Sequence, residues 1–128
     1  MDLCDAIGCE FVYTTSASCP TCQAATPEAM ADLVEYSFGN ESTAWGRKRI
    51  SHGHPKKYSL KYVELGNEQF NPDWAAQVTA MQARAVSLGE AEKLVISRCF
   101  VIGQMSQSNL SLDCWYHVKM TGALRSRM

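Results

Sequence analysis

Residues 61–69 read KYVELGNEQ, and this stretch predicts a short buried strand that ends in an Asn-Glu pair. Val63 and Leu65 supply the β-branched and apolar bulk that is typical of such a strand. Side chains alternate along an extended strand, so Glu64 and Glu68 share one face. Parallel α/β folds carry their chemistry where the strands end. The position of Glu68 therefore indicates a candidate site, although the Asn-Glu pair alone is more typical of a polar turn.

The chain as a whole has the composition of one globular domain. It has 128 residues, of which 46% are hydrophobic and 20% charged, enough to bury a core. The formal net charge of −1 gives neither the basic footprint of a nucleic-acid-binding protein nor a strong field for a membrane surface. No apolar run reaches the roughly 18–20 residues that cross a bilayer, and the first residues carry no secretion signal. We therefore expect neither nucleic acid nor a membrane as partner, and the compartment and the oligomeric state stay open.

The predicted elements alternate between helices and strands. Thr26 followed by Pro27 is a helix start, and Gly39 is a helix stop. The elements in chain order are a helix over 1–7 closed by Gly8, a strand over 10–15, a helix over 26–38, a strand over 61–65 and a helix over 72–88 closed by Gly89. This alternation favours an α/β fold of parallel βα units with right-handed crossovers.

Two parts of the chain lack this regular pattern. Residues 40–58 predict a loop, in which the basic cluster 47–49 forms a solvated charged face. Beyond Gly89, residues 94–102 and 112–120 are compatible with strands, and the last residues predict a loose end.

Six cysteines leave the redox compartment undecided. Cys4, Cys9, Cys99 and Cys114 lie among apolar residues, and we expect them to behave as small hydrophobic side chains.

Cys19-Pro20-Thr21-Cys22 forms a CxxC motif between a predicted strand and a predicted helix. At a helix N-terminus such a motif lowers the thiol pKa and supports disulfide exchange. The helix starts only at Thr26, so Cys19 and Cys22 gain little from its dipole. A small redox or binding module that uses these two thiols is the alternative function, and a loop disulfide or two inert thiols is the more ordinary account.

Several separated motifs together resemble the α-L-arabinofuranosidases of glycoside hydrolase family 51. The resemblance covers roughly residues 1–88, and the motifs appear in the family's order. They are MDLC with AIG within 1–8, DLVEY at 32–36, TAWG at 43–46, GHP at 53–55, Tyr58 and KYVELGNE at 61–68.

This resemblance implies an eight-stranded (β/α)8 TIM barrel, of which residues 1–89 would supply about the third and fourth βα units. Residues 90–128 would then form an irregular C-terminal tail. The implied reaction is retaining hydrolysis of terminal α-L-arabinofuranosyl residues in polysaccharides, without a metal or other cofactor. The resemblance also allows an extracellular location.

The resemblance also implies two site residues. Glu68 would be the general acid/base, and Asn67 would hydrogen-bond the sugar 2-hydroxyl. A retaining mechanism needs one protonated carboxyl and an ionised carboxylate about 5–5.5 Å away. A partly desolvated barrel mouth can raise the pKa of the acid.

The second carboxylate is the main departure from the family. In the family it is a Glu on the seventh strand, and a whole barrel needs about 200–250 residues. Glu41, Glu64 and Glu90 lack the strand-end context of a nucleophile. We therefore expect these 128 residues to be an inactive fragment when taken alone.

Two tryptophans and two histidines are weaker candidates. Trp74 lies on the apolar stripe of its helix, which favours core packing over sugar stacking, whereas Trp45 precedes the catalytic strand and either role stays open. His52 and His54 are zinc ligands by residue type only, since a zinc site needs two more ligands.

Overall fold

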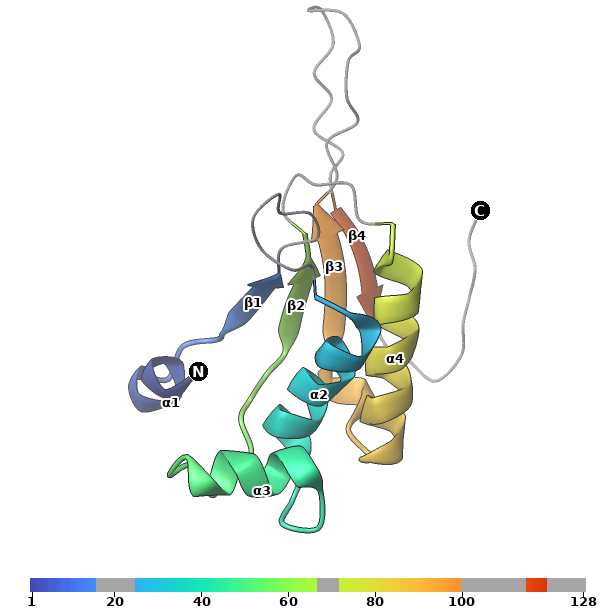
Figure 1. Cartoon of the computed structure of the whole chain (residues 1–128). Coiled ribbons are helices and arrows are strands. Elements are labelled where there is room, and N and C mark those ends of the chain that lie inside the picture. Colours follow the sequence, from blue (N-terminus) through green and yellow to red (C-terminus); the bar gives the residue numbers. More distant parts are fainter. Residues whose placement is uncertain (16–24, 67–71, 100–114, 120–128) are drawn as a thin grey trace, which may run out of the picture.

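The computed structural model describes residues 1–15, 25–66 and 72–97 and the backbone of 98–99 and 115–119. A four-stranded sheet with the order β1-β2-β3-β4 forms its centre (Figure 1). The strands are β1 Val12–Thr15, β2 Tyr62–Leu65, β3 Val95–Cys99 and β4 Trp115–Lys119. β2 is parallel to both β1 and β3, whereas β4 is antiparallel to β3. The expected parallel arrangement is thus confirmed for β1 to β3.

The helices are α1 Asp2–Ile7, α2 Pro27–Phe38, α3 Ala44–Ser51 and α4 Trp74–Ser87, with a short 3₁₀ turn at Ala91–Lys93. α2 and α4 lie side by side over one face of the sheet, and α3 lies beyond the end where the strands begin (Figure 1). In the described parts of the chain, no helix is long and apolar enough to cross a membrane.

The core lies between the sheet and the pair α2–α4. Val63 and Leu65 are almost completely buried on the covered face, as the alternation along β2 predicts. Ile96 of β3 is the register partner of Val63 and is also buried. The helices contribute the apolar side chains that meet them, namely Met30, Val34, Phe38, Val78, Met81 and Ala85. Trp74 is partly buried against this core, which confirms its predicted packing role.

The helix ends follow the predicted signals closely. Thr26 caps α2, because its hydroxyl accepts a hydrogen bond of 3.1 Å from the Ala29 N–H, and Pro27 occupies the first turn. α4 starts slightly later than predicted, with Asp73 at the N-cap position.

The expected loop over residues 40–58 is wrong for residues 44–51, which form α3. The sequence AWGRKRIS has no strong apolar stripe, so its helical character is weak in isolation. Two contacts with residues N-terminal to it start the helix. The Thr43 hydroxyl accepts a hydrogen bond from the Gly46 N–H, and the Glu35 carboxylate of α2 accepts one from the Trp45 N–H at 2.9 Å.

Arg49 corrects the prediction that residues 47–49 all form a solvated face. Only 1% of this residue is exposed, whereas Arg47 and Lys48 are exposed. Its guanidinium donates hydrogen bonds to the carbonyl oxygens of Tyr36, Ser37, Gly39, His54 and Pro55. Because the first three belong to the C-terminal end of α2, the cation meets the negative end of that helix. Arg49 thereby ties α2 to the segment that leads into β2.

Candidate active site at the carboxyl end of β2

The carboxyl end of β2 is where the predicted catalytic pair begins. Leu65 ends the strand, and Gly66 follows in a left-handed conformation with φ 88°. This conformation is open to glycine at little cost and redirects the chain as it leaves the sheet. Asn67 and Glu68 come next and lie outside the described residues, as do Cys19 and Cys22. The structure therefore defines the strand that delivers the pair, and the roles of all four residues stay predictions.

β1 and β2 end at the same edge of the sheet. Thr15, the last residue of β1, is the register partner of Leu65, the last residue of β2. The segments after both strands therefore start at one edge, although about 50 residues of sequence separate them. Gln77 in α4, which is buried, donates a hydrogen bond of 2.5 Å to the Ala25 carbonyl just before α2. The starts of α2 and α4 are thus held together near this edge.

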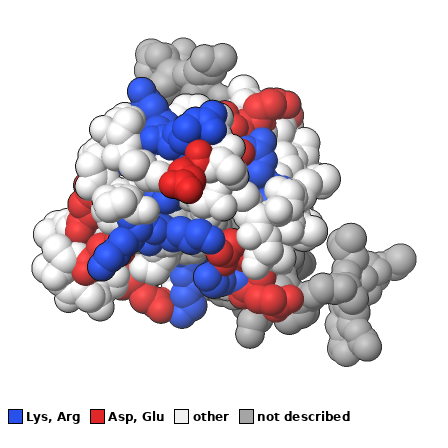
Figure 2. All heavy atoms as spheres, turned by 90° about the horizontal axis from the view of Figure 1, so that it is seen from below, with Lys and Arg blue, Asp and Glu red and all other residues white. Residues whose placement is uncertain are grey.

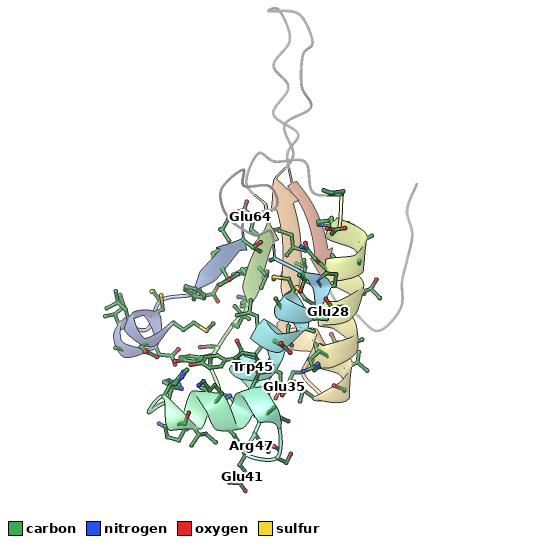
Figure 3. All side chains as sticks on the ribbon, in the orientation of Figure 1. Glu28, Glu35, Glu41, Trp45, Arg47 and Glu64 are labelled. Carbon is green, nitrogen blue, oxygen red and sulfur yellow. The ribbon has the colours of Figure 1, made fainter. Side chains whose placement is uncertain are left out.

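The sheet face opposite the helices carries the more polar side chains of β1 and β2. Thr14 and Val12 of β1 are exposed, and their partners Glu64 and Tyr62 of β2 are half-buried. The Thr14 hydroxyl donates a hydrogen bond of 2.9 Å to Glu64 Oε2. Figure 3 shows Glu64 in the upper part of the sheet, towards the end where the strands finish.

The sequence analysis did not identify Thr14 as the hydrogen-bond partner of Glu64. The signal was present, because Thr14 alternates with Tyr13 and Thr15 in β1. Only the register between β1 and β2 shows which residue lies opposite Glu64.

Trp45 lies far from this edge. Figure 3 shows it beside Glu35 at the α3 end of the molecule, below Glu64. Its ring makes an edge contact with Tyr36, with 6.4 Å between the ring centroids. The expectation that Trp45 lies in a loop before the catalytic strand is therefore wrong, since it lies on α3.

The two candidate zinc histidines make contacts of other kinds at the α3 end. His52 Nδ1 hydrogen-bonds the Tyr36 hydroxyl at 2.9 Å, and His54 Nε2 lies 3.3 Å from an Asp5 carboxylate oxygen. The His54 ring also stacks on Tyr58. Within the part of the chain that the structure describes, no three His, Cys, Asp or Glu residues form a metal-binding group.

Tyr58 connects this cluster to α1. Its hydroxyl donates a hydrogen bond to the Asp2 carboxylate. Burial raises the pKa of Tyr58, and the Asp2 hydrogen bond raises it further. The Tyr58 hydroxyl therefore stays a proton donor rather than a titrating group.

Two of the other carboxylates lie away from the carboxyl edge or are already paired. Figure 3 places Glu41 at the turn between α2 and α3. Glu90 is mostly buried. Its carboxylate forms ion pairs with the Nζ atoms of Lys57 at 2.8 Å and Lys93 at 2.6 Å. Burial opposes ionisation of Glu90, but the hydrogen bonds from both lysines outweigh it and lower its pKa. An ionised side chain held by two lysines is a structural group.

A hollow of about 580 Å³ lies at the end of the sheet where the strands begin. Its lining includes Glu10 and Lys61, which form an ion pair of 2.6 Å, and Val95 at the start of β3. Figure 2 views the molecule from this end and shows positive and negative side chains interspersed over the surface. This hollow is therefore distinct from the candidate active site at the opposite edge.

Parallel strands joined through helices define an α/β protein, a class in which sites commonly lie where the strands end. Residues 1–110 match the family described as Alpha-L-arabinofuranosidase 1 domain. The chain belongs to this family. The match includes β3 and extends past residue 89, and the division into a barrel part and a tail stays a prediction.

Curated relatives give the same family name. The chain is 40% identical over 42 residues to the extracellular exo-alpha-L-arabinofuranosidase of Streptomyces chartreusis and 43% identical over 37 residues to alpha-L-arabinofuranosidase 2 of Arabidopsis thaliana. It is 32% identical over 71 residues to the probable alpha-L-arabinofuranosidase C of Aspergillus fumigatus. These matches cover 33%, 29% and 56% of this chain and 5%, 6% and 14% of the relatives. No solved structure matches.

Proposed function

We propose that this chain is part of the catalytic domain of a retaining α-L-arabinofuranosidase of glycoside hydrolase family 51. The domain is a (β/α)8 barrel, to which this chain contributes about the third and fourth βα units. The substrate is an arabinose-containing polysaccharide or oligosaccharide, from which the enzyme removes terminal α-L-arabinofuranosyl residues.

The observation that carries this proposal is the arrangement of β1, β2 and β3 in a chain of this family. The three strands are parallel, and α2 and α4 cover one face only. In a barrel, helices cover the outside and strand side chains fill the inside in layers. Thr14 of β1 and Glu64 of β2 lie on the other face, so in a barrel they would point inside, in neighbouring layers because alternate strands build each layer.

Glu68 is the general acid/base in this proposal. It protonates the glycosidic oxygen while the nucleophile attacks the anomeric carbon, and it then takes a proton from the water that releases arabinose. Asn67 hydrogen-bonds the sugar 2-hydroxyl, an interaction that strengthens in the transition state. A position directly after β2 suits both roles, because enzyme sites of barrel folds lie at the carboxyl ends of the strands.

The 128 residues alone are inactive in this proposal, since the second carboxylate of a retaining mechanism comes from another strand of the barrel. The first test is release of arabinose or nitrophenol from arabinofuranosyl substrates by the purified chain. We expect no release above that of the Glu68→Gln variant. Hydrolysis that Glu68→Gln abolishes would show that this chain contains a complete site.

A chimaera tests the role of Glu68 directly. Residues 62–88 of this chain replace the corresponding strand and helix of the Aspergillus fumigatus relative. We expect Glu68→Ala in the active chimaera to lower kcat/KM about 10²- to 10⁴-fold on substrates with poor leaving groups. The loss should be smaller with a nitrophenyl leaving group, which needs no protonation, and added azide should restore turnover.

Glu64→Ala in the same chimaera is the matched control, because Glu64 is a carboxylate of β2 four positions before Glu68 in the sequence. We expect it to lack azide rescue and to affect both kinds of substrate equally. If Glu64→Ala showed the leaving-group dependence and the rescue instead, the assignment of Glu68 would be wrong.

A further inference from the structure

The end of α1 brings two cysteines together. Gly8 has a left-handed conformation with φ 73°, and the Cys9 N–H donates a hydrogen bond of 3.0 Å to the Cys4 carbonyl. This bond from the second residue after the helix back to its last full turn is the Schellman pattern. The pattern commonly brings the side chains at these two positions into contact, usually as a hydrophobic pair. In this chain both side chains are thiols.

Both thiols can be reached from outside. Cys9 is exposed and Cys4 is half-buried, and both are free in the structure. Both also line the hollow of about 580 Å³ at the end where the strands begin. The expectation that both cysteines behave as small hydrophobic side chains among apolar residues is therefore wrong for the exposed Cys9. Hydrogen bonding with the Cys4 side chain raises the pKa of the Cys9 thiol, which is a further sign that the side chains interact.

We propose that Cys4 and Cys9 form a reversible disulfide site that clips the C-terminal end of α1. The oxidant is a low-molecular-weight disulfide such as oxidised glutathione, which the adjoining hollow leaves room to approach. This inference is independent of the proposed hydrolysis, because it uses neither Asn67 nor Glu68.

The exchange proceeds in two balanced steps. The exposed Cys9 thiolate attacks one sulfur of the small disulfide, forms a mixed disulfide and expels one small thiolate. The Cys4 thiolate then attacks the Cys9 sulfur, forms the Cys4–Cys9 bond and expels the second small thiolate. The two protons lost by the cysteines go to the two expelled thiolates. The two cysteines are oxidised by two electrons in total, and the small disulfide is reduced to two thiols.

The backbone hydrogen bond at the helix end favours the close approach that this bond needs. Protein disulfides require Cα atoms about 4.4–6.8 Å apart, and the 3.0 Å hydrogen bond between the Cys9 N–H and the Cys4 carbonyl keeps these two residues close.

The Cys4–Cys9 disulfide would act on α1, a helix that has few contacts with the core. α1 buries none of its residues and contacts the rest of the fold through polar groups, such as Asp2 with Tyr58 and Asp5 with Ser59. The disulfide adds a covalent link to the last turn of this helix.

The test uses the reduced, full 128-residue chain and oxidised glutathione. Cleavage by chymotrypsin after Phe11 separates Cys4 and Cys9 from the CxxC motif. We expect the peptide that ends at Phe11 to lose two hydrogens in mass and to regain them with a reductant. In the Cys19→Ser/Cys22→Ser double variant, the count of free thiols should fall by two. A peptide that keeps both thiols, or a link from Cys9 to Cys19 or Cys22, would overturn the proposal.

Two further experiments, one on the Cys4→Ser variant and one on the urea-unfolded chain, test whether the folded helix end promotes the Cys4–Cys9 bond. Cys4→Ser should stop the reaction at the mixed disulfide, leaving one glutathione on Cys9. Unfolding the chain in urea should slow closure of the Cys4–Cys9 bond, since the cap no longer holds the two residues together. Closure at the same rate in urea would show that sequence proximity alone produces the disulfide and would refute a site built by the fold.

Discussion

The Thr14 hydroxyl donates a hydrogen bond of 2.9 Å to Glu64 Oε2 across the parallel pair β1–β2. The two residues are 50 positions apart in sequence and directly opposite in register. Their contact fixes the carboxylate on the sheet face that the helices leave open. Thr14 and Glu64 are each the second-last residue of their strand, so this polar contact lies one residue before the carboxyl edge of the sheet.

Thr14→Val tests this contact with little change in shape. We expect the free energy of unfolding to fall by about 1 kcal/mol, because a hydrogen bond to a charged group is lost at a partly exposed site. Urea unfolding followed by circular dichroism measures the change. Thr14→Ser keeps the hydroxyl and should lie closer to the parent chain. A loss for Thr14→Ser that exceeds the loss for Thr14→Val would mean that the methyl group, rather than the hydrogen bond, matters.

Arg49→Met removes the buried guanidinium and leaves several carbonyl oxygens without their donor. Since each buried unsatisfied group costs about 1–3 kcal/mol, we expect a loss of at least about 3 kcal/mol. Arg49→Lys keeps the charge but not the planar fork of donors, so it should also destabilise the chain. Arg47→Met is the matched control, because Arg47 is exposed on the same helix. Thermal unfolding that is equally shifted by both Met variants would contradict the anchoring role of Arg49.

Gly46→Ala tests the close packing at the start of α3. A Cβ atom at this position would overlap the Asn40 carbonyl oxygen and lie 2.6 Å from the Thr43 hydroxyl oxygen. Both are part of the turn that caps the helix, so we expect a loss of at least about 2 kcal/mol. Denaturant unfolding measures the effect.

Gly53→Ala serves as the comparison for this variant. A Cβ at Gly53 meets nothing within 4 Å, and only its φ of 89° disfavours alanine. We expect a cost of about 1–2 kcal/mol for the left-handed conformation. A larger loss for Gly53→Ala than for Gly46→Ala would contradict the steric explanation.

Glu90 should make the chain sensitive to acid. Its pKa in the folded state lies below the ordinary value of 4.5. Its contribution to stability is therefore fully present above about pH 4.5 and is lost as the pH falls through the folded-state pKa. Glu90→Gln removes this titration, so its stability should change less between neutral and acidic pH. Unfolding midpoints measured across that range check the expectation, and parallel pH profiles for the two chains would contradict it.

Local sequence signals located the regular elements well. The Thr26-Pro27 start, the alternation of Val63 with Glu64, and the helical spacing of Met81 and Ala85 each appear in the structure as predicted. These signals succeed because capping, strand alternation and helical periodicity depend on residues within a few positions of one another.

Local signals did not predict α3, because contacts with residues of α2 stabilise this helix. The Glu35 carboxylate of α2 accepts the Trp45 N–H, and the carbonyl groups of α2 accept the hydrogen bonds of Arg49. Within the sequence, Arg49 is indistinguishable from its basic neighbours. Its burial follows only from the position of the C-terminal end of α2.

The sequence by itself determined the α/β character of the chain, the ends of α2 and the buried face of β2, because local backbone and packing preferences decide them. Only the tertiary structure decided that Thr14 bonds Glu64, that Arg49 is buried, and that Trp45 lies at the opposite end from Glu64. These relationships depend on strand register and helix packing, which join residues far apart in the sequence. The physical reason is that a side chain's environment is set by its neighbours in space, and a local pattern contains no information about which neighbours those are.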